Sequence, residues 1–245
     1  TFFKNVKQNP LKSFCRFFYH YTLEIKRAFK KQYFFVFVGP DGAGKTTLIN
    51  MLKSDSRGIF KSDNNRFQVF HHRPHLLLNI NSLFKKKLTT KEIHDLNFNP
   101  HSAKQSSSIV SFLKLMYYTA DYLFGYLSKV IKLQRNNKFI IFDRYFFDFI
   151  VDQKRSAIKI NRKIAMLIYR FFIPKPNQVF FIKVNAQVAY NRKRELPVKT
   201  IGVINREFKY LSSILPDFET IHNDSLEESY NIIRINFIKK ITTKI

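Results

Sequence analysis

The residues with the most evident chemistry are Gly39-Pro40-Asp41-Gly42-Ala43-Gly44-Lys45-Thr46-Thr47, here called the phosphate loop. A glycine-rich turn lets backbone N–H groups converge on phosphate oxygens, and a following helix adds the positive end of its dipole. The Lys45 ammonium suits the β and γ phosphates, while the Thr46 hydroxyl suits the shell of a Mg²⁺ ion. The loop therefore predicts binding of a nucleoside triphosphate, with ATP and Mg²⁺ as the cofactors.

A second candidate site follows the apolar run 139–142, at Asp143-Arg144-Tyr145. An aspartate at the end of a strand beside the phosphate-loop strand can hold Mg²⁺ through water, and the rigid fork of Arg144 can grip a phosphate. Translocases commonly follow this aspartate with a glutamate that activates water, whereas an arginine follows it here. The pair favours a phosphorylated acceptor over hydrolysis.

Alternating strands and helices must position these two sites. Short β-rich runs separated by long helical segments predict parallel strands joined by right-handed crossovers, and hence a three-layer α/β fold of the P-loop NTPase type with a five-stranded parallel sheet. The expected strands cover residues 33–38, 66–70, 138–142, 178–184 and 218–222. A long helix is expected over 109–133.

The chain of 245 residues suits one α/β domain that carries the phosphate loop, over 33–245, with an N-terminal extension over 1–32. The extension carries eight basic residues against Glu24 and predicts a basic amphipathic helix beginning after Pro10. Packing of that helix against the catalytic core is the favoured interpretation, and contact with a membrane surface or a partner protein is the alternative. The polar stretch 76–108 predicts a long loop.

Overall composition discriminates less between functions. The formal charge of +26 would attract a polyanion, but its lysines are scattered along every segment and a kinase with two anionic substrates also benefits from positive potential. No specific nucleic-acid partner is expected. A single cysteine, Cys15, excludes a disulfide framework and fits a reducing compartment. With no evident signal or spanning segment, a cytoplasmic location is expected, with peripheral membrane contact through the extension as the alternative.

Three motifs together resemble the thymidylate kinase family: the phosphate loop, Tyr118-Thr119-Ala120-Asp121 and Asp143-Arg144-Tyr145. More narrowly, the chain is similar to thymidylate kinase-like proteins of bacterial polysaccharide gene clusters. That similarity rests on His72-Arg73-Pro74, on the continuation of the third motif through Asp148 to Asp152, and on Arg192-Lys193-Arg194-Glu195-Leu196-Pro197. It covers the chain from about Tyr33 onward.

The resemblance implies a role for each site residue. It implies catalytic roles for Lys45, Asp143, Arg144, Arg192 and Arg194, the last two on a closing lid at about 186–200, and metal binding by Thr46 and Asp143. Acceptor binding is implied for Asp41, which would approach the sugar hydroxyl, and for Arg73, Asp121, Tyr122, Arg144 and Tyr145. Tyr122 stands where thymidylate kinases usually carry a base-reading arginine, and a tyrosine cannot make the same forked contact.

The implied activity is ATP- and Mg-dependent transfer of the γ-phosphate to a nucleoside monophosphate, with dTMP giving dTDP. Two alternatives stay open: a kinase of the same fold that acts on another phosphorylated acceptor, such as a sugar or lipid precursor, and a basic surface-associated protein that uses ATP as a switch. The expected partners are small-molecule nucleotides, with a homodimer as a further expectation.

Overall fold

The computed structural model describes residues 34–60, 66–78 and 105–242. The predicted extension over 1–32 and most of the predicted loop over 76–108 lie outside the described residues, and these predictions stay untested. Each strand is short and rich in β-branched or aromatic residues, which favour the extended conformation. The strands are β1 (Phe34–Val38), β2 (Phe67–His71), β3 (Phe139–Asp143), β4 (Gln178–Lys183) and β5 (Phe218–His222).

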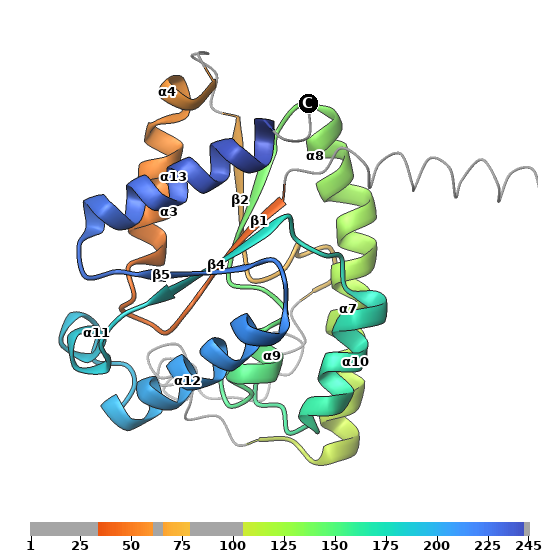
Figure 1. Ribbon diagram of the computed structural model, residues 1–245. Coiled ribbons are helices and arrows are strands. Elements are labelled where there is room, and N and C mark those ends of the chain that lie inside the picture. The colour runs from red at the N-terminus through yellow and green to blue at the C-terminus, as the bar shows by residue number, and fades with distance from the viewer. Residues whose placement is uncertain (1–33, 61–65, 79–104, 243–245) are drawn as a thin grey trace, which may run out of the picture. The chain divides into compact units, whose positions relative to one another are not determined.

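The five strands form one parallel sheet in the order β2-β3-β1-β4-β5 (Figure 1). The central strand β1 pairs with β3 in the register Phe37 to Asp143, and with β4 on its other side. Parallel strands present their carboxyl ends at one edge, so the phosphate loop after β1 and Asp143 at the end of β3 lie at the same edge of the sheet. The predicted three-layer α/β fold and its five-stranded parallel sheet are confirmed.

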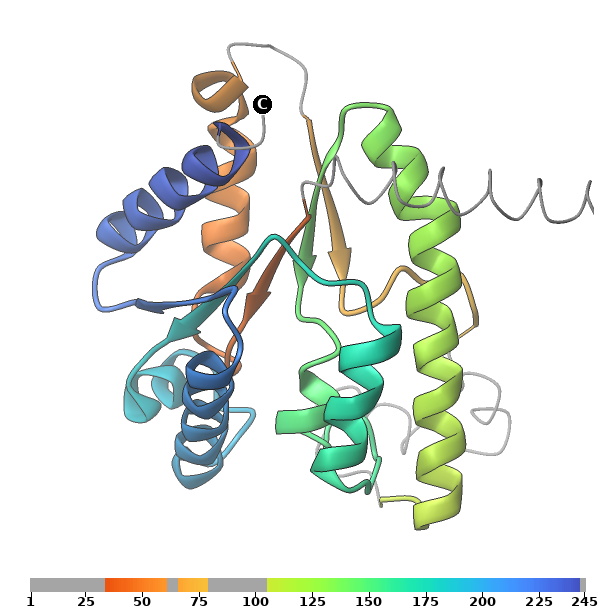
Figure 2. The ribbon, with the colours of Figure 1, turned by 45° about the vertical axis from the view of Figure 1, so that its right-hand side comes forward.

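Helices cover both faces of the sheet (Figure 2). One face carries α3 (Lys45–Ser54) and α13 (Leu226–Thr242), which pack against each other, and α4 (Ser56–Phe60) follows α3. The other helices are α7 (Ser108–Gly125), α8 (Ile131–Arg135), α9 (Asp148–Val151), α10 (Arg162–Phe172), α11 (Ala186–Arg192) and α12 (Val198–Ile214). Figure 2 shows α7 and α10 on the face opposite α3, and α12 packs on β4, β5 and α9.

The aromatic residues of β1 join the two layers of helices to the sheet. Phe34 meets the rings of Tyr126 and Tyr145 on one face, at centroid distances of 5.8 and 5.3 Å. Phe35 points to the other face and lies 4.3 Å from Phe237 of α13. Alternation of side chains along a strand thus lets consecutive phenylalanines fill two separate cores.

The long helix predicted over 109–133 exists but is not regular throughout. It consists of α7, one turn of π-helix, η3 (Tyr126–Val130), and α8. A π turn is a local bulge that is frequent near functional sites, and apolar periodicity does not reveal it. Among the described helices, none has the length and apolar character that a membrane span requires.

Candidate functional site

The phosphate loop joins β1 to α3 through a backbone that glycine alone accommodates. Gly42 and Gly44 have φ values of 79° and 89°, in the left-handed region that residues with a Cβ rarely adopt. A Cβ on Gly42 would also lie 2.4 Å from the carbonyl oxygen of Ala189 in α11. Helix α11 therefore packs directly on the loop, and its position depends on the absence of a side chain at Gly42.

Gly42→Ala is expected to weaken binding of Mg-ATP at least tenfold, about 1.4 kcal/mol, because either the loop or α11 must move. Calorimetric titration of the full chain measures the affinity. Gly202→Ala is the matched control, since a Cβ added there meets nothing within 4 Å. Equal affinities of the two variants for Mg-ATP would contradict this account of the loop.

Lys45 begins α3, and its side chain folds back over the phosphate loop. The ammonium donates to the carbonyl oxygens of Gly39 and Pro40, at 3.0 and 2.7 Å. Burial, followed by the nearby Arg144 guanidinium, lowers the pKa of Lys45 to about 7. A phosphate bound in the loop would stabilise the charged form of Lys45, which burial and Arg144 disfavour. The geometry fits the phosphate contact predicted for Lys45.

Asn223, which sequence reasoning missed, contacts the phosphate loop from the end of β5. Asn223 follows β5, and its side-chain amide donates to the carbonyl oxygen of Ala43 at 2.7 Å. Its backbone N–H donates to the carbonyl oxygen of Lys183 at the end of β4. The residue thus ties three strand ends together, although a lone asparagine after a strand carries no motif that would announce this role.

Asp143 and Thr46 lie together at the end of β3 and the start of α3. The Thr46 hydroxyl donates to Asp143 Oδ2 at 3.2 Å, and His71 Nδ1 lies 3.5 Å from the same oxygen. Burial alone would raise the pKa of Asp143, but the hydrogen bond from His71 and the charge of Lys45 hold the pKa below its ordinary value. Asp143 is therefore an ionised carboxylate near neutral pH.

The same pair fits a magnesium ion. Asp143 Oδ1 is buried and has no hydrogen-bond partner in the part of the chain that the structure describes. Mg²⁺ takes oxygen ligands and usually keeps several waters, so one free carboxylate oxygen beside a threonine hydroxyl is a suitable donor set. The residues predicted to hold the metal are thus adjacent in space.

Two arginines converge on Asp41 inside the phosphate loop. Arg144 Nη2 lies 2.5 Å from Asp41 Oδ1, and Arg155 Nη1 donates to Asp41 Oδ2. Burial by itself would raise the pKa of Asp41, but the two guanidinium groups hold it far below its ordinary value. An ionised carboxylate therefore sits between two cations beside Lys45. Sequence reasoning placed Asp41 and Arg144 here but missed Arg155, which lies in the turn after α9.

Arg144 is fixed by contacts on two sides. Its Nη1 donates to Asp148 Oδ2 at 2.9 Å, and its backbone N–H donates to the carbonyl oxygen of Phe37 at 2.8 Å. Its φ of 72° is left-handed, a conformation that costs a non-glycine residue on the order of 1–3 kcal/mol and persists where the surroundings enforce it. Asp148, which had no predicted role, thus orients the guanidinium of Arg144.

The predicted acceptor side holds a buried ion pair. Arg73 Nη1 lies 2.8 Å from Asp121 Oδ2, with side-chain exposures of 3% and 0%. Asp121 Oδ1 accepts hydrogen bonds from the backbone N–H groups of Leu76 and Leu77, at 2.8 and 2.7 Å. The Arg73 guanidinium also lies over the ring of Tyr118, 4.8 Å from its centroid. Asp121 therefore fastens the segment that carries Arg73 onto α7.

Tyr122 and Tyr145 lie inside the protein in this conformation. The Tyr122 hydroxyl donates to the carbonyl oxygen of His72, and the Tyr145 hydroxyl donates to that of Pro174 at 2.8 Å. The two rings meet edge to face with centroids 4.9 Å apart. Burial raises the pKa of each phenol well above its ordinary value. Both hydroxyls thus have internal partners, and the predicted contacts with an acceptor stay predictions.

The predicted lid, at about 186–200, comprises α11 and the residues that lead into α12. The side chains of Arg192 and Arg194 are exposed, and between them Lys193 lies 3.0 Å from Glu195. Neither arginine forms an ion pair with any residue that the structure describes. Neither side chain has a hydrogen bond or ion pair to the phosphate loop among the described residues, so their catalytic role stays a prediction that requires closure.

The sequence matches no protein-family model and no curated protein. Among solved structures, the chain is similar to the crystal structure of thymidylate kinase from Ehrlichia chaffeensis, with a TM-score of 0.54 and 17% sequence identity. The match covers 84% of this chain and 98% of that one. At this identity the similarity shows that the chain has a thymidylate kinase-like fold.

Proposed function

We propose that this protein is an ATP- and Mg-dependent kinase that transfers the γ-phosphate to a nucleoside monophosphate, with dTMP giving dTDP. The observation that carries the proposal is the arrangement at one sheet edge of Lys45, Asp143 and the Arg144–Asp41–Arg155 cluster. These groups match the parts that phosphoryl transfer needs, which are cations for the phosphates and a carboxylate for the metal. The similarity to a thymidylate kinase structure supports the same conclusion.

Phosphoryl transfer between two phosphates requires that the donor and the acceptor are positioned, and it requires no strong base. An oxygen of the acceptor phosphate attacks the γ-phosphorus, the bond to the ADP oxygen breaks, and the acceptor gains one phosphoryl group. Because that attacking oxygen is already ionised, the protein contributes alignment and charge neutralisation. Lys45 and Arg144 would neutralise the phosphates, and Thr46 with Asp143 would hold Mg²⁺. Held by these two residues, Mg²⁺ would supply positive charge that offsets the charge of the phosphates.

Asp41 has a second role in this proposal. Its carboxylate occupies the space between Arg144 and Arg155, where an anionic group would be stabilised by both. A phosphate entering the loop would compete with Asp41 for these guanidinium groups, and Asp41 would then be released toward the acceptor hydroxyl that the resemblance assigns to it. Arg155 thus becomes a second fixed cation of the transfer site.

Arg155→Ala is expected to lower kcat about a hundredfold, since removing one group that stabilises transition-state charge typically costs that much. Arg192→Ala removes the same side chain from the predicted lid and gives the matched comparison. Steady-state rates of ADP formation with dTMP measure both. A larger loss in Arg192→Ala than in Arg155→Ala would show that the lid, and not the turn after α9, supplies the essential charge.

A different phosphorylated acceptor, such as a sugar or lipid precursor, is the second candidate. The buried Tyr122 favours it, because its hydroxyl is bonded to His72 and offers no forked contact to a base. ATP use as a switch is less well supported, since a switch needs no arginine on an acceptor phosphate. ADP formation with a panel of nucleoside monophosphates and phosphosugars separates these candidates. No acceptor-stimulated ADP formation with any nucleoside monophosphate would refute the proposed activity.

A further inference from the structure

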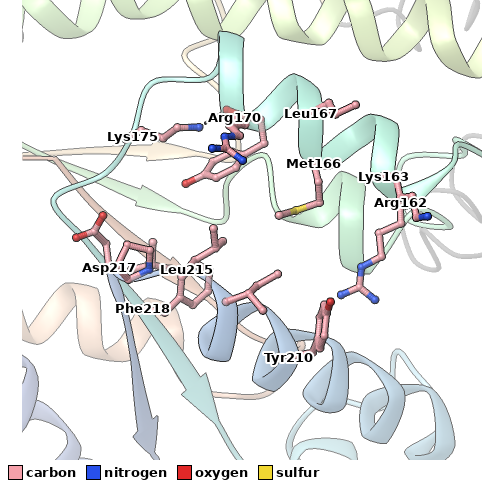
Figure 3. A pocket seen from close by; sticks show the side chains of 14 residues that line it. Arg162, Lys163, Met166, Leu167, Arg170, Lys175, Tyr210, Leu215, Asp217 and Phe218 are labelled. Carbon is pink, nitrogen blue, oxygen red and sulfur yellow. Dashed lines mark hydrogen bonds between the residues drawn. The ribbon is translucent and has the colours of Figure 1, made fainter.

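A cavity of about 840 Å³ lies between α10 and α12, away from the phosphate loop (Figure 3). Val179 near the start of β4 and Phe218 at the start of β5 form part of its wall. These are the amino ends of the strands, whereas the phosphate loop follows the carboxyl end of β1. Its volume lies within the range of small-molecule sites. The proposed kinase reaction makes no use of this cavity.

The middle of the cavity is apolar. Met166 projects from α10 into the cavity (Figure 3), and Leu167 of α10, Ile214 at the end of α12 and Leu215 also line it. Two of these side chains remain substantially open to solvent, with exposed fractions of 54% for Leu167 and 46% for Ile214. Apolar side chains that flank a cavity and stay exposed gain free energy when a hydrocarbon group covers them.

The rim of the cavity is cationic. Arg162, Lys163, Arg170 and Lys175 line it, against one acid, Asp217. Arg162 is already paired, because its Nη1 lies 2.5 Å from Glu207. The other three cations form no ion pair with a carboxylate of the described residues. The rim therefore carries an excess of positive charge beside an apolar wall.

Arg170 and Lys175 concentrate this charge at one end. The Lys175 ammonium lies over the ring of Tyr169, 3.4 Å from its centroid, and donates to the Tyr169 carbonyl oxygen. Burial, followed by the charge of Arg170, lowers the pKa of Lys175 to about 8. Two cations that repel each other at the end of an apolar cavity are relieved by an anion placed between them.

We propose that this cavity binds an anionic amphiphile, with its phosphate head at Arg170 and Lys175 and its single hydrocarbon chain along Met166, Leu167 and Ile214. A free phosphate would leave the apolar wall exposed, and a neutral chain would leave the cations uncompensated. The two features together select a ligand that carries both groups. A cavity this far from the nucleotide site makes the two sites separable by experiment.

Dodecyl phosphate is the probe, titrated calorimetrically into the 245-residue chain below its micelle concentration. Dodecyl maltoside supplies the same chain without charge, and inorganic phosphate supplies the head without the chain. We expect saturable one-to-one binding of dodecyl phosphate, at least tenfold tighter than that of dodecyl maltoside, and no saturable binding of phosphate at the same concentrations. Equal affinity for the two dodecyl compounds, or no saturable binding of either, would overturn the proposal.

Variants locate the site. The double variant Arg170→Gln with Lys175→Gln should weaken dodecyl phosphate binding at least tenfold. Lys199→Gln with Lys209→Gln removes the same charge from α12 outside the cavity and should leave the affinity unchanged. Saturating Mg-ATP should not displace the probe. Displacement by Mg-ATP, or equal losses in the two double variants, would place the amphiphile elsewhere and refute the assignment to this cavity.

Discussion

Lys45→Ala is expected to lower the rate of phosphoryl transfer from ATP about a thousandfold. The Lys45 ammonium is the cation held within the phosphate loop, and no neighbouring side chain on α3 can replace it. Alanine is a strong helix former, and the buried carboxylates of Asp41 and Asp143 keep the Arg144 guanidinium as a compensating charge when the Lys45 ammonium is removed. The variant should therefore fold normally and lose activity alone.

Initial rates of ADP formation at saturating acceptor measure this loss, and circular dichroism checks the fold. Lys53→Ala is the matched control, because Lys53 lies in the last turn of the same helix. It should retain wild-type activity within a factor of two or so, as surface substitutions usually do. Comparable activity of the Lys45 and Lys53 variants would mean that the phosphate loop does not act as the donor site.

Asp121→Ala is expected to lower the free energy of unfolding by about 3–5 kcal/mol, the usual cost of removing one partner from a buried ion pair. The substitution leaves the Arg73 guanidinium buried without its carboxylate, and it also removes the acceptor for the backbone N–H groups of Leu76 and Leu77. Urea unfolding followed by circular dichroism gives the value. Asp224→Ala, at an exposed aspartate, should change it by less than about 0.5 kcal/mol.

A double variant distinguishes the buried charge from lost packing. Asp121→Leu combined with Arg73→Met removes both charges, and replacing a whole buried pair by apolar groups is often neutral or stabilising. The double variant should thus be more stable than Asp121→Leu alone. If it were less stable than that single variant, the ion pair would not explain the destabilisation.

Much of the fold could be predicted from the apolar runs and the phosphate-loop motif of the sequence. All five predicted strands exist, with ends displaced by at most one residue, because short runs rich in β-branched and aromatic residues between turn-forming segments leave few alternatives. The phosphate-loop motif located the end of β1 and the start of α3. The pairing of β1 with β3 places Asp143 beside that loop, as expected. The π turn at Tyr126–Val130 was missed, since one extra residue in a helical turn barely alters the apolar pattern.

Sequence reasoning singled out candidate site residues that belong to contiguous motifs, and it missed residues that do not. Arg155 reaches Asp41 from an irregular turn that includes Ala157 at a φ of 49°. No periodicity predicts the course of such a turn. Asn223 is a single amide at the end of the edge strand β5, and its contact with Ala43 depends on the strand order. The internal partner of the Tyr122 hydroxyl depends equally on the tertiary packing of His72.

The proposed activity transfers the γ-phosphate of ATP to the phosphate of an acceptor. Phosphorus-31 NMR of the full chain with Mg-ATP and dTMP measures this directly, because a new diphosphate has resonances distinct from those of inorganic phosphate. We expect ATP and dTMP to be consumed in equal amounts as ADP and dTDP appear, and we expect neither change with Lys45→Ala. Formation of inorganic phosphate in place of dTDP, or of no product with dTMP and every other nucleoside monophosphate, would contradict the proposed activity.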